Sequence, residues 1–100
     1  MLYQDRIIDA IKSRKQLSLI YKNEGYRTIC PHILFENEKG NKIIDAYQLS
    51  GYSNHPLSLH DWKLFNIENI TQLTVLENKF NIAPGYNPSS DKYHFIIAKV

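Results

Sequence analysis

The stretch Tyr26–Leu49, YRTICPHILFENEKGNKIIDAYQL, decides the fold of this chain. Its runs 26–36 and 42–49 are rich in β-branched and aromatic residues, and the turn-forming sequence NEKGN separates them. This pattern predicts a β-hairpin. Pro31 interrupts the first run, and a proline inside a strand requires either a sheet edge or a β-bulge.

Outside this hairpin, the sequence predicts one helix and three more strands. Apolar residues at helical spacing indicate a helix over residues 3–14. Alternating apolar and polar residues indicate a strand at 17–22, and further strand-like runs lie at 56–67 and 71–77. The alternation slips by one residue near His60, which predicts a β-bulge in the fourth strand. Short strands joined by tight turns favour a small, strongly bent sheet.

We expect a mainly β fold of the α+β class, organised as a single domain of 100 residues. The N-terminal helix precedes an antiparallel, five-stranded β-barrel over 17–77, and a short C-terminal segment occupies 78–100. The last ten residues, DKYHFIIAKV, fit two alternatives, a helix capped by Ser90 or a strand. The helix is the favoured alternative.

The composition is that of an ordinary soluble protein, with 43% hydrophobic and 22% charged residues. Twelve basic and ten acidic side chains give a net charge of +2, which permits weak attraction to polyanions but lacks the clustered Lys and Arg of nucleic-acid-binding proteins. The single cysteine, Cys30, excludes an internal disulfide and fits a reducing cytosol. The sequence shows neither a signal peptide nor a membrane-spanning run, so we expect a cytoplasmic protein without membrane contact.

Polar and aromatic residues gather around one turn, in the stretch DAYQLSGYSNHPLSLHDWKLF at 45–65. The stretch holds two tyrosines, two histidines and the only tryptophan, and the whole chain carries seven tyrosines against four phenylalanines. Tyrosine suits a partly wet surface that contacts a partner. Small β domains also use tyrosine on half-exposed sheets, so a structural role is the alternative.

Several short motifs occur in an order that resembles a known family. They are IIDAIKSRKQLSLIY at 7–21, Arg27-x-x-x-Pro31-His32, IIDAYQL at 43–49, Tyr47-Gln48-x-x-Gly51-x-Ser53, and Trp62-Lys63. Over residues 6–80 the chain resembles the WYL domain, a bacterial Sm-like, SH3-type β-barrel, and especially its small standalone members. The tripeptide that names the family is absent here, and no helix-turn-helix precedes the barrel. The resemblance implies a regulatory, ligand-sensing barrel whose ligand is a nucleotide or a single strand of nucleic acid.

Eight side chains are candidate ligand-binding residues: Tyr21, Arg27, His32, Tyr47, Gln48, Ser53, Trp62 and Lys63. Arg27 either faces a phosphate, as the resemblance implies, or forms a surface salt bridge. His32 either lines a groove beside the bend at Pro31 or makes a structural hydrogen bond. The Gln48 amide either hydrogen-bonds to the edge of a ligand or lies at the end of the barrel with all its hydrogen bonds made within the protein.

The pair Trp62-Lys63 also has two interpretations. Adjacent residues on a strand point to opposite faces, so the two side chains act together only if a bulge turns one of them. In that case an aromatic ring beside a cation suits stacking on a nucleotide base. Otherwise Trp62 fills the core and Lys63 is solvated.

No set of residues predicts catalysis or a metal site. Cys30 and His32 lie two residues apart, which is too far for a thiol–imidazole pair unless the strand bends between them. His55, His60 and Asp61 lack the regular four-ligand spacing of structural zinc. We therefore expect a protein that is not an enzyme and uses no cofactor.

The sequence thus favours a binding module that takes a nucleotide-like or other anionic ligand in a regulatory role. This interpretation requires His32, Gln48 and Trp62 to meet around one groove of the bent sheet. The alternative is a protein–protein interaction module, which forms homo-oligomers or binds another protein through exposed strand edges.

Overall fold

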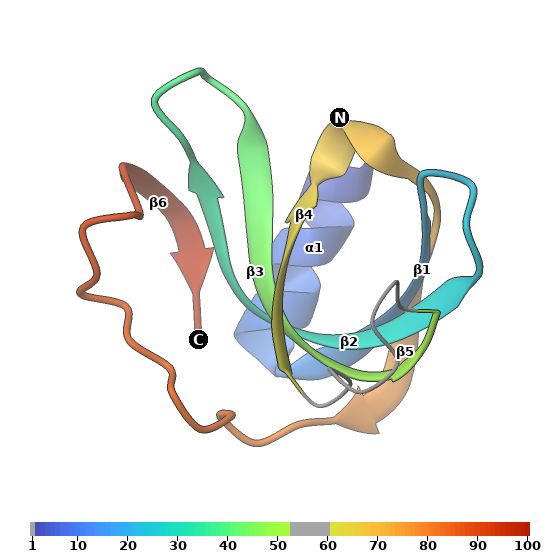
Figure 1. Cartoon of the computed structure of the whole chain (residues 1–100). Helices are drawn as coiled ribbons and strands as arrows, with labels where there is room; N and C mark the ends of the chain where they lie inside the picture. Colours follow the sequence, from blue (N-terminus) through green and yellow to red (C-terminus); the bar gives the residue numbers. More distant parts are fainter. Residues whose placement is uncertain (1, 53–60) are drawn as a thin grey trace.

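The structure is a computed structural model that describes residues 2–52 and 61–100, which fold into one α-helix and six strands (Figure 1). In chain order the elements are α1 (Leu2–Ser13), β1 (Lys15–Tyr21), β2 (Tyr26–Glu36), β3 (Lys42–Gly51), β4 (Asp61–Asn66), the 3₁₀-helix η2 (Ile67–Asn69), β5 (Ile70–Lys79) and β6 (Phe95–Lys99). The predicted helix corresponds to α1, and the first, second, third and fifth predicted strands correspond to β1, β2, β3 and β5. β4 matches the second half of the fourth predicted strand, and the bulge predicted at His60 falls outside the described residues.

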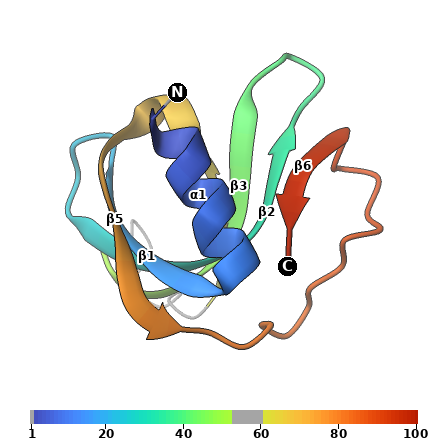
Figure 2. The ribbon, with the colours of Figure 1, turned by 180° about the vertical axis from the view of Figure 1, so that it is seen from behind.

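Helix α1 is amphipathic and covers one side of the sheet (Figure 2). Ile7, Ala10 and Ile11 lie at helical spacing and are fully buried against the strands. The helix ends where Arg14 takes a left-handed conformation, with φ of 54°, and donates its backbone N–H to the Ile11 carbonyl oxygen at 3.2 Å. The chain therefore turns directly from α1 into β1.

The central strand, β2, changes partner along one of its edges. It pairs with β3 along one edge, and along the other it pairs first with β1, through residues 26–29, and then with β6, through 33–36. Pro31 falls at the changeover, where a missing backbone N–H costs least. The register against β3 shifts between Pro31 and Ile33, so the ladder is irregular at the proline, as expected for a proline inside a strand.

The sheet is antiparallel and is not closed. Its strand order is β4-β3-β2-β1-β5, with β6 added to β2. The ends of this path, β4 and β5, do not pair with each other within the described residues. The five-stranded barrel is therefore not confirmed, whereas the mainly β, α+β class is. A side chain links β4 to the β5 side of the opening, because Tyr21, at the end of β1 opposite Ile70 of β5, accepts a hydrogen bond from the Asn66 backbone N–H at 3.0 Å through its hydroxyl.

The C-terminal residues form a strand, so the helix favoured from the sequence is wrong. β6 pairs with the edge of β2 that β1 leaves open, and Ala98 joins the buried core. This pairing satisfies the backbone groups along the facing edges of both strands, and a helix in the same place would leave the edge of β2 unpaired.

The centre of the sheet, around β2 and β3, is buried on both sides. The main core lies on one side, where α1 packs against residues such as Leu17, Ile44 and Phe65. The other side is covered by residues 80–94, the connection from β5 to β6, which we call the strap. Figure 1 shows the strap passing around the sheet in orange and red. Each candidate residue can therefore be placed on the main-core side or on the strap side.

Candidate functional site

The candidate residues divide between the two sides of the sheet. In the β3–β4 ladder, Tyr47 lies opposite Trp62 and Gln48 lies opposite Asp61. Opposed residues share a face, and successive residues alternate between faces. Tyr47 and Trp62 therefore lie on the strap side, with ring centroids 5.7 Å apart, whereas Gln48 and Lys63 lie on the main-core side.

The groove predicted from His32, Gln48 and Trp62 is not formed. His32 contacts the Trp62 ring at a centroid distance of 4.8 Å on the strap side, while Gln48 lies on the opposite side of the sheet. Both His32 and Gln48 are 0% exposed. The prediction of one shared groove is wrong, because strand alternation separates these residues and packing seals two of them. Ser53, another candidate, lies outside the described residues.

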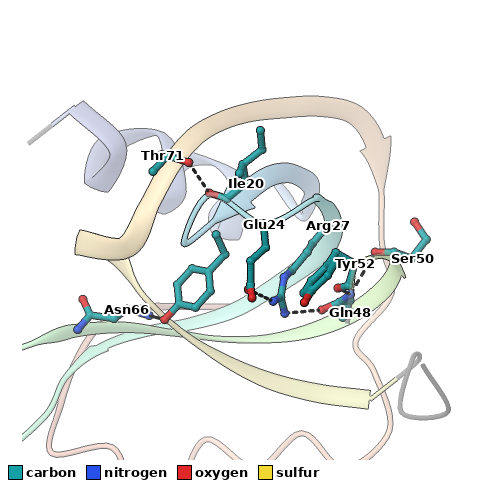
Figure 3. A network of polar contacts seen from close by, with 9 residues as sticks. Ile20, Glu24, Arg27, Gln48, Ser50, Tyr52, Asn66 and Thr71 are labelled. Atoms are coloured by element: carbon teal, nitrogen blue, oxygen red, sulfur yellow. Dashed lines mark hydrogen bonds and ion pairs between the residues drawn. The ribbon is translucent and has the colours of Figure 1, made fainter. Parts of the chain in front are cut away.

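Arg27 is the centre of a buried polar network on the main-core side (Figure 3). Its side chain is 9% exposed, and the guanidinium donates from Nη2 to the Glu24 carboxylate at 3.2 Å and from Nη1 to Gln48 Oε1 at 3.4 Å. Nε is buried and has no hydrogen-bond partner among the described residues. Both hydrogen bonds are long for N–H···O contacts, so the guanidinium is only partly satisfied.

Three aromatic rings surround the Arg27 guanidinium. The rings of Tyr21, Tyr52 and Phe65 have centroids 5.6, 5.3 and 5.4 Å from its central carbon. Contacts of this kind contribute about 0.5–2 kcal/mol each, depending on how far water is excluded. The rings contact the flat faces of the guanidinium, whereas an anion would hydrogen-bond to the N–H groups at its edge.

The Gln48 amide is hydrogen-bonded within the protein. Its Nε2 donates to the carbonyl oxygens of Tyr52 at 2.8 Å and Ser50 at 3.3 Å, while Oε1 accepts from Arg27. These partners come together because Gly51 takes a φ of +100°, which turns the end of β3 back toward the amide. The amide therefore fixes the position of the Arg27 guanidinium.

Glu24 is a partner of Arg27 that the sequence analysis did not single out. The turn between β1 and β2 places it there, since Lys22 and Asn23 both have left-handed φ angles, 54° and 58°, and the Glu24 N–H donates to the Tyr21 carbonyl oxygen at 3.0 Å. The signal in the sequence is an acidic residue three positions before an arginine, across the predicted turn. A salt bridge at Arg27 was one of the two alternatives, but it is buried rather than on the surface.

His32 joins the strap to β2 on the other side of the sheet. Its Nδ1 lies 2.7 Å from the carbonyl oxygen of Cys30, which can only accept, so Nδ1 carries the proton. Nε2 then accepts a hydrogen bond from the Ala83 backbone N–H at 3.0 Å. Burial lowers the pKa of His32, which favours this neutral imidazole.

Aromatic residues enclose His32. The ring centroids of Trp62, Phe80 and Tyr86 lie 4.8, 4.9 and 5.4 Å from that of the imidazole. The Trp62 indole Nε1 donates to the Pro84 carbonyl oxygen at 2.8 Å, which adds a second polar link to the strap. The strap-side residues thus pack as a small second core.

Asp45 makes a further contact with the strap that sequence reasoning missed. Its buried carboxylate accepts a hydrogen bond from the Tyr93 hydroxyl at 2.6 Å and forms an ion pair with Lys92 Nζ at 2.9 Å. Burial, together with the Asp45 carboxylate, raises the pKa of the Tyr93 hydroxyl. The available signal was a single carboxylate within the apolar run KIIDAYQL.

Cys30 is expected to be unreactive in the folded protein. The side chain is buried, and burial raises the pKa of its thiol to about 11. Because the thiolate is the reactive form, a chromogenic disulfide reagent at pH 8 should label the folded chain about 100-fold more slowly than the urea-unfolded chain. Labelling at the same rate in both states would show that the thiol is accessible.

The described residues contain neither a metal-binding cluster nor a membrane-spanning helix. Within 2–52 and 61–100, no three His, Cys, Asp or Glu side chains lie close enough to hold a metal ion. In the same ranges no helix is long and apolar enough to cross a membrane. His55 and His60 fall outside them.

Comparison with known proteins does not assign the chain to a family. No family model matches it, and neither a curated protein nor a solved structure does. The chemistry of the Arg27 network is therefore the basis for inferring a function.

Proposed function

We propose that the protein is a non-enzymatic binding module of the WYL type, which takes a nucleotide-like or other anionic ligand at Arg27 in a regulatory role. In this proposal the open, bent sheet is a variant of the Sm-like, SH3-type barrel that the sequence resemblance implies. The single cysteine fits a module that works in the bacterial cytoplasm. The observation that supports the proposal is the buried, partly satisfied guanidinium of Arg27.

A guanidinium binds an oxyanion best through two parallel N–H donors. Arg27 offers Nε, which has no partner among the described residues, next to Nη2, which holds Glu24 by one long contact. An incoming phosphate or carboxylate would accept from both nitrogens and displace the Glu24 carboxylate. The Glu24 carboxylate therefore occupies the position that the ligand would take, and it competes with the ligand for Arg27.

The surroundings of Arg27 favour a ligand that also carries an aromatic ring. Tyr52 is 39% exposed while its ring lies beside the guanidinium, and exposed aromatic rings stack on nucleotide bases. Lys22 lies 5.5 Å from the centroid of the Tyr21 ring, and Lys63 projects on the same side of the sheet as Gln48. Positive charge near the site favours a phosphate group.

Replacing Glu24 with glutamine should tighten anion binding. The change removes the carboxylate that competes for Arg27, so we expect Glu24→Gln to bind pyrophosphate and ATP about 3–10-fold more tightly than the native chain, as measured by calorimetry at low salt. Arg27→Gln should abolish binding, and circular dichroism should verify that this variant is folded.

Glu38 provides a matched control, because it lies exposed in the turn between β2 and β3 and carries the same charge. Glu38→Gln should leave the affinity unchanged within about twofold. The proposal fails if neither the native chain nor Glu24→Gln binds pyrophosphate, ATP or a short oligothymidylate, or if both glutamate variants change the affinity equally.

A further inference from the structure

The N-terminal half of the strap, residues 80–86, is held to the sheet by a histidine. The Ala83 N–H donates to His32 Nε2 at 3.0 Å, and the Pro84 carbonyl oxygen accepts from the Trp62 indole at 2.8 Å. A hollow of about 320 Å³ lies between β3 and this half of the strap. Apart from the packing of Phe80 and Tyr86 against the His32 ring and the hydrogen bond from the Tyr86 hydroxyl to the Val100 carbonyl oxygen at 3.1 Å, these residues are held by few polar contacts.

The C-terminal half of the strap, residues 87–94, is held to the sheet by contacts that do not involve a histidine. Tyr93 and Lys92 bind the Asp45 carboxylate at 2.6 and 2.9 Å, and Tyr93 packs on the Phe35 ring at a centroid distance of 5.0 Å. The chain then enters β6, which pairs with β2. This half therefore stays attached when the contact at His32 is lost.

Only a neutral imidazole fits the contact with Ala83. Nδ1 already donates to the Cys30 carbonyl oxygen, so an additional proton must bind at Nε2. Nε2–H would then face the Ala83 N–H across 3.0 Å, and two donors cannot form a hydrogen bond. Protonation of His32 thus removes the acceptor that holds Ala83.

Groups from four parts of the fold face His32. Burial has the largest effect and lowers its pKa from the ordinary value of 6.5; the hydrogen bond to the Cys30 carbonyl oxygen and the Asp45 carboxylate on β3 oppose this, and Arg14 after α1 adds to it. Cys30 on β2 and Tyr86 in the strap are neutral neighbours, because burial raises the pKa of both. The unfolded chain therefore takes up this proton more readily, so the closed strap is favoured above pH 6.5 and is lost as the pH falls below it.

We infer that residues 80–86 form an acid-sensitive cover, which detaches when His32 is protonated and exposes Trp62 and Cys30 while the main core stays folded. Figure 1 shows why the release can be local, since the strap runs along the outside of the sheet and α1 lies on the other side. This inference concerns the strap side and does not depend on ligand binding at Arg27.

Nuclear magnetic resonance of the full chain from pH 8 to pH 4.5 tests whether residues 80–86 detach as His32 is protonated. The Ala83 amide and the Trp62 indole N–H should change with one midpoint below pH 6.5, matching the titration of the His32 ring protons. Hydrogen exchange at Ala83, corrected for the intrinsic rate, should become at least about tenfold faster across this midpoint. Amides of β1 and β5 should keep their shifts.

His32→Gln supplies an amide oxygen as acceptor without a titrating group, so its Ala83 and Trp62 signals should not change over this range. His94→Gln removes an exposed histidine in the strap and should leave the transition intact. The inference is overturned if the two signals stay constant in the native chain, if they change only together with β1 and β5, or if His32→Gln shows the same transition. Should His32→Gln not fold, the native titration alone decides.

Discussion

Replacing Gly51 with alanine will destabilise the fold by more than about 4 kcal/mol, which corresponds to a melting temperature lower by roughly 15 °C or more. Gly51 has a φ of +100°, and a Cβ atom there would lie 2.1 Å from the carbonyl oxygen of Tyr26 and 2.7 Å from Cα of Arg27. These are backbone atoms of β2 that pair with the end of β3, so they cannot move without breaking the ladder. Chemical denaturation measures the loss.

Gly40 is the matched control for this substitution. Its φ is +82°, but no atom lies within 4 Å of the position that a Cβ would take. Gly40→Ala should therefore cost only about 1–2 kcal/mol, from the left-handed conformation alone. Equal losses for the two variants would show that the close approach at Gly51 is not what matters.

Because Gly51 also positions the Tyr52 carbonyl against Gln48, any folded Gly51→Ala protein should bind anions more weakly.

Replacing His32 with alanine should destabilise the protein by about 3–5 kcal/mol. The substitution empties a fully buried site between three aromatic rings and leaves the Ala83 N–H and the Cys30 carbonyl oxygen without their side-chain partner. Urea unfolding at pH 8, followed by Trp62 fluorescence and by circular dichroism, measures the effect. Trp62 fluorescence should shift to longer wavelength even before the main transition, because the strap loosens first.

His94→Ala separates this effect from the general loss of a histidine. His94 is exposed, so its removal should change the free energy of unfolding by no more than about 0.5 kcal/mol. His32→Gln should fall between the two variants, because it keeps an acceptor for Ala83. A loss below about 1 kcal/mol for His32→Ala would mean that the strap does not depend on this side chain.

The helix and most of the strands could be predicted because their signals are local. Alternation in LSLIYK and the turn former NEKGN depend on neighbouring residues alone, and they placed β1 and the β2–β3 hairpin correctly. Pro31 was equally informative, since a residue without an N–H must lie where the ladder is interrupted.

The C-terminal strand was mispredicted because its structure is set by a distant partner. DKYHFIIAKV has apolar residues that fit a helix or a strand, and the choice depends on the unpaired edge of β2 beyond His32. Closure of the sheet depends likewise on whether β4 reaches β5.

The sequence indicated which faces of the strand two of the candidate residues occupy, but not how the candidate residues are arranged in space. Alternation already indicated that Tyr47 and Gln48 face opposite sides, which is what the β3–β4 register shows. The sequence could not indicate that the strap would bury His32 and Trp62 on one side while Glu24 would bind Arg27 on the other.

By itself, the sequence determined the class of fold, the positions of the main strands and an interruption of the ladder at Pro31, since each follows from the backbone preferences of residues close together in the chain. Tertiary structure alone decided which side of the sheet each polar group occupies, how deeply it is buried and what it binds. The physical reason is that burial and hydrogen bonding depend on segments far apart in the chain, such as His32 with Ala83 and Asp45 with Tyr93.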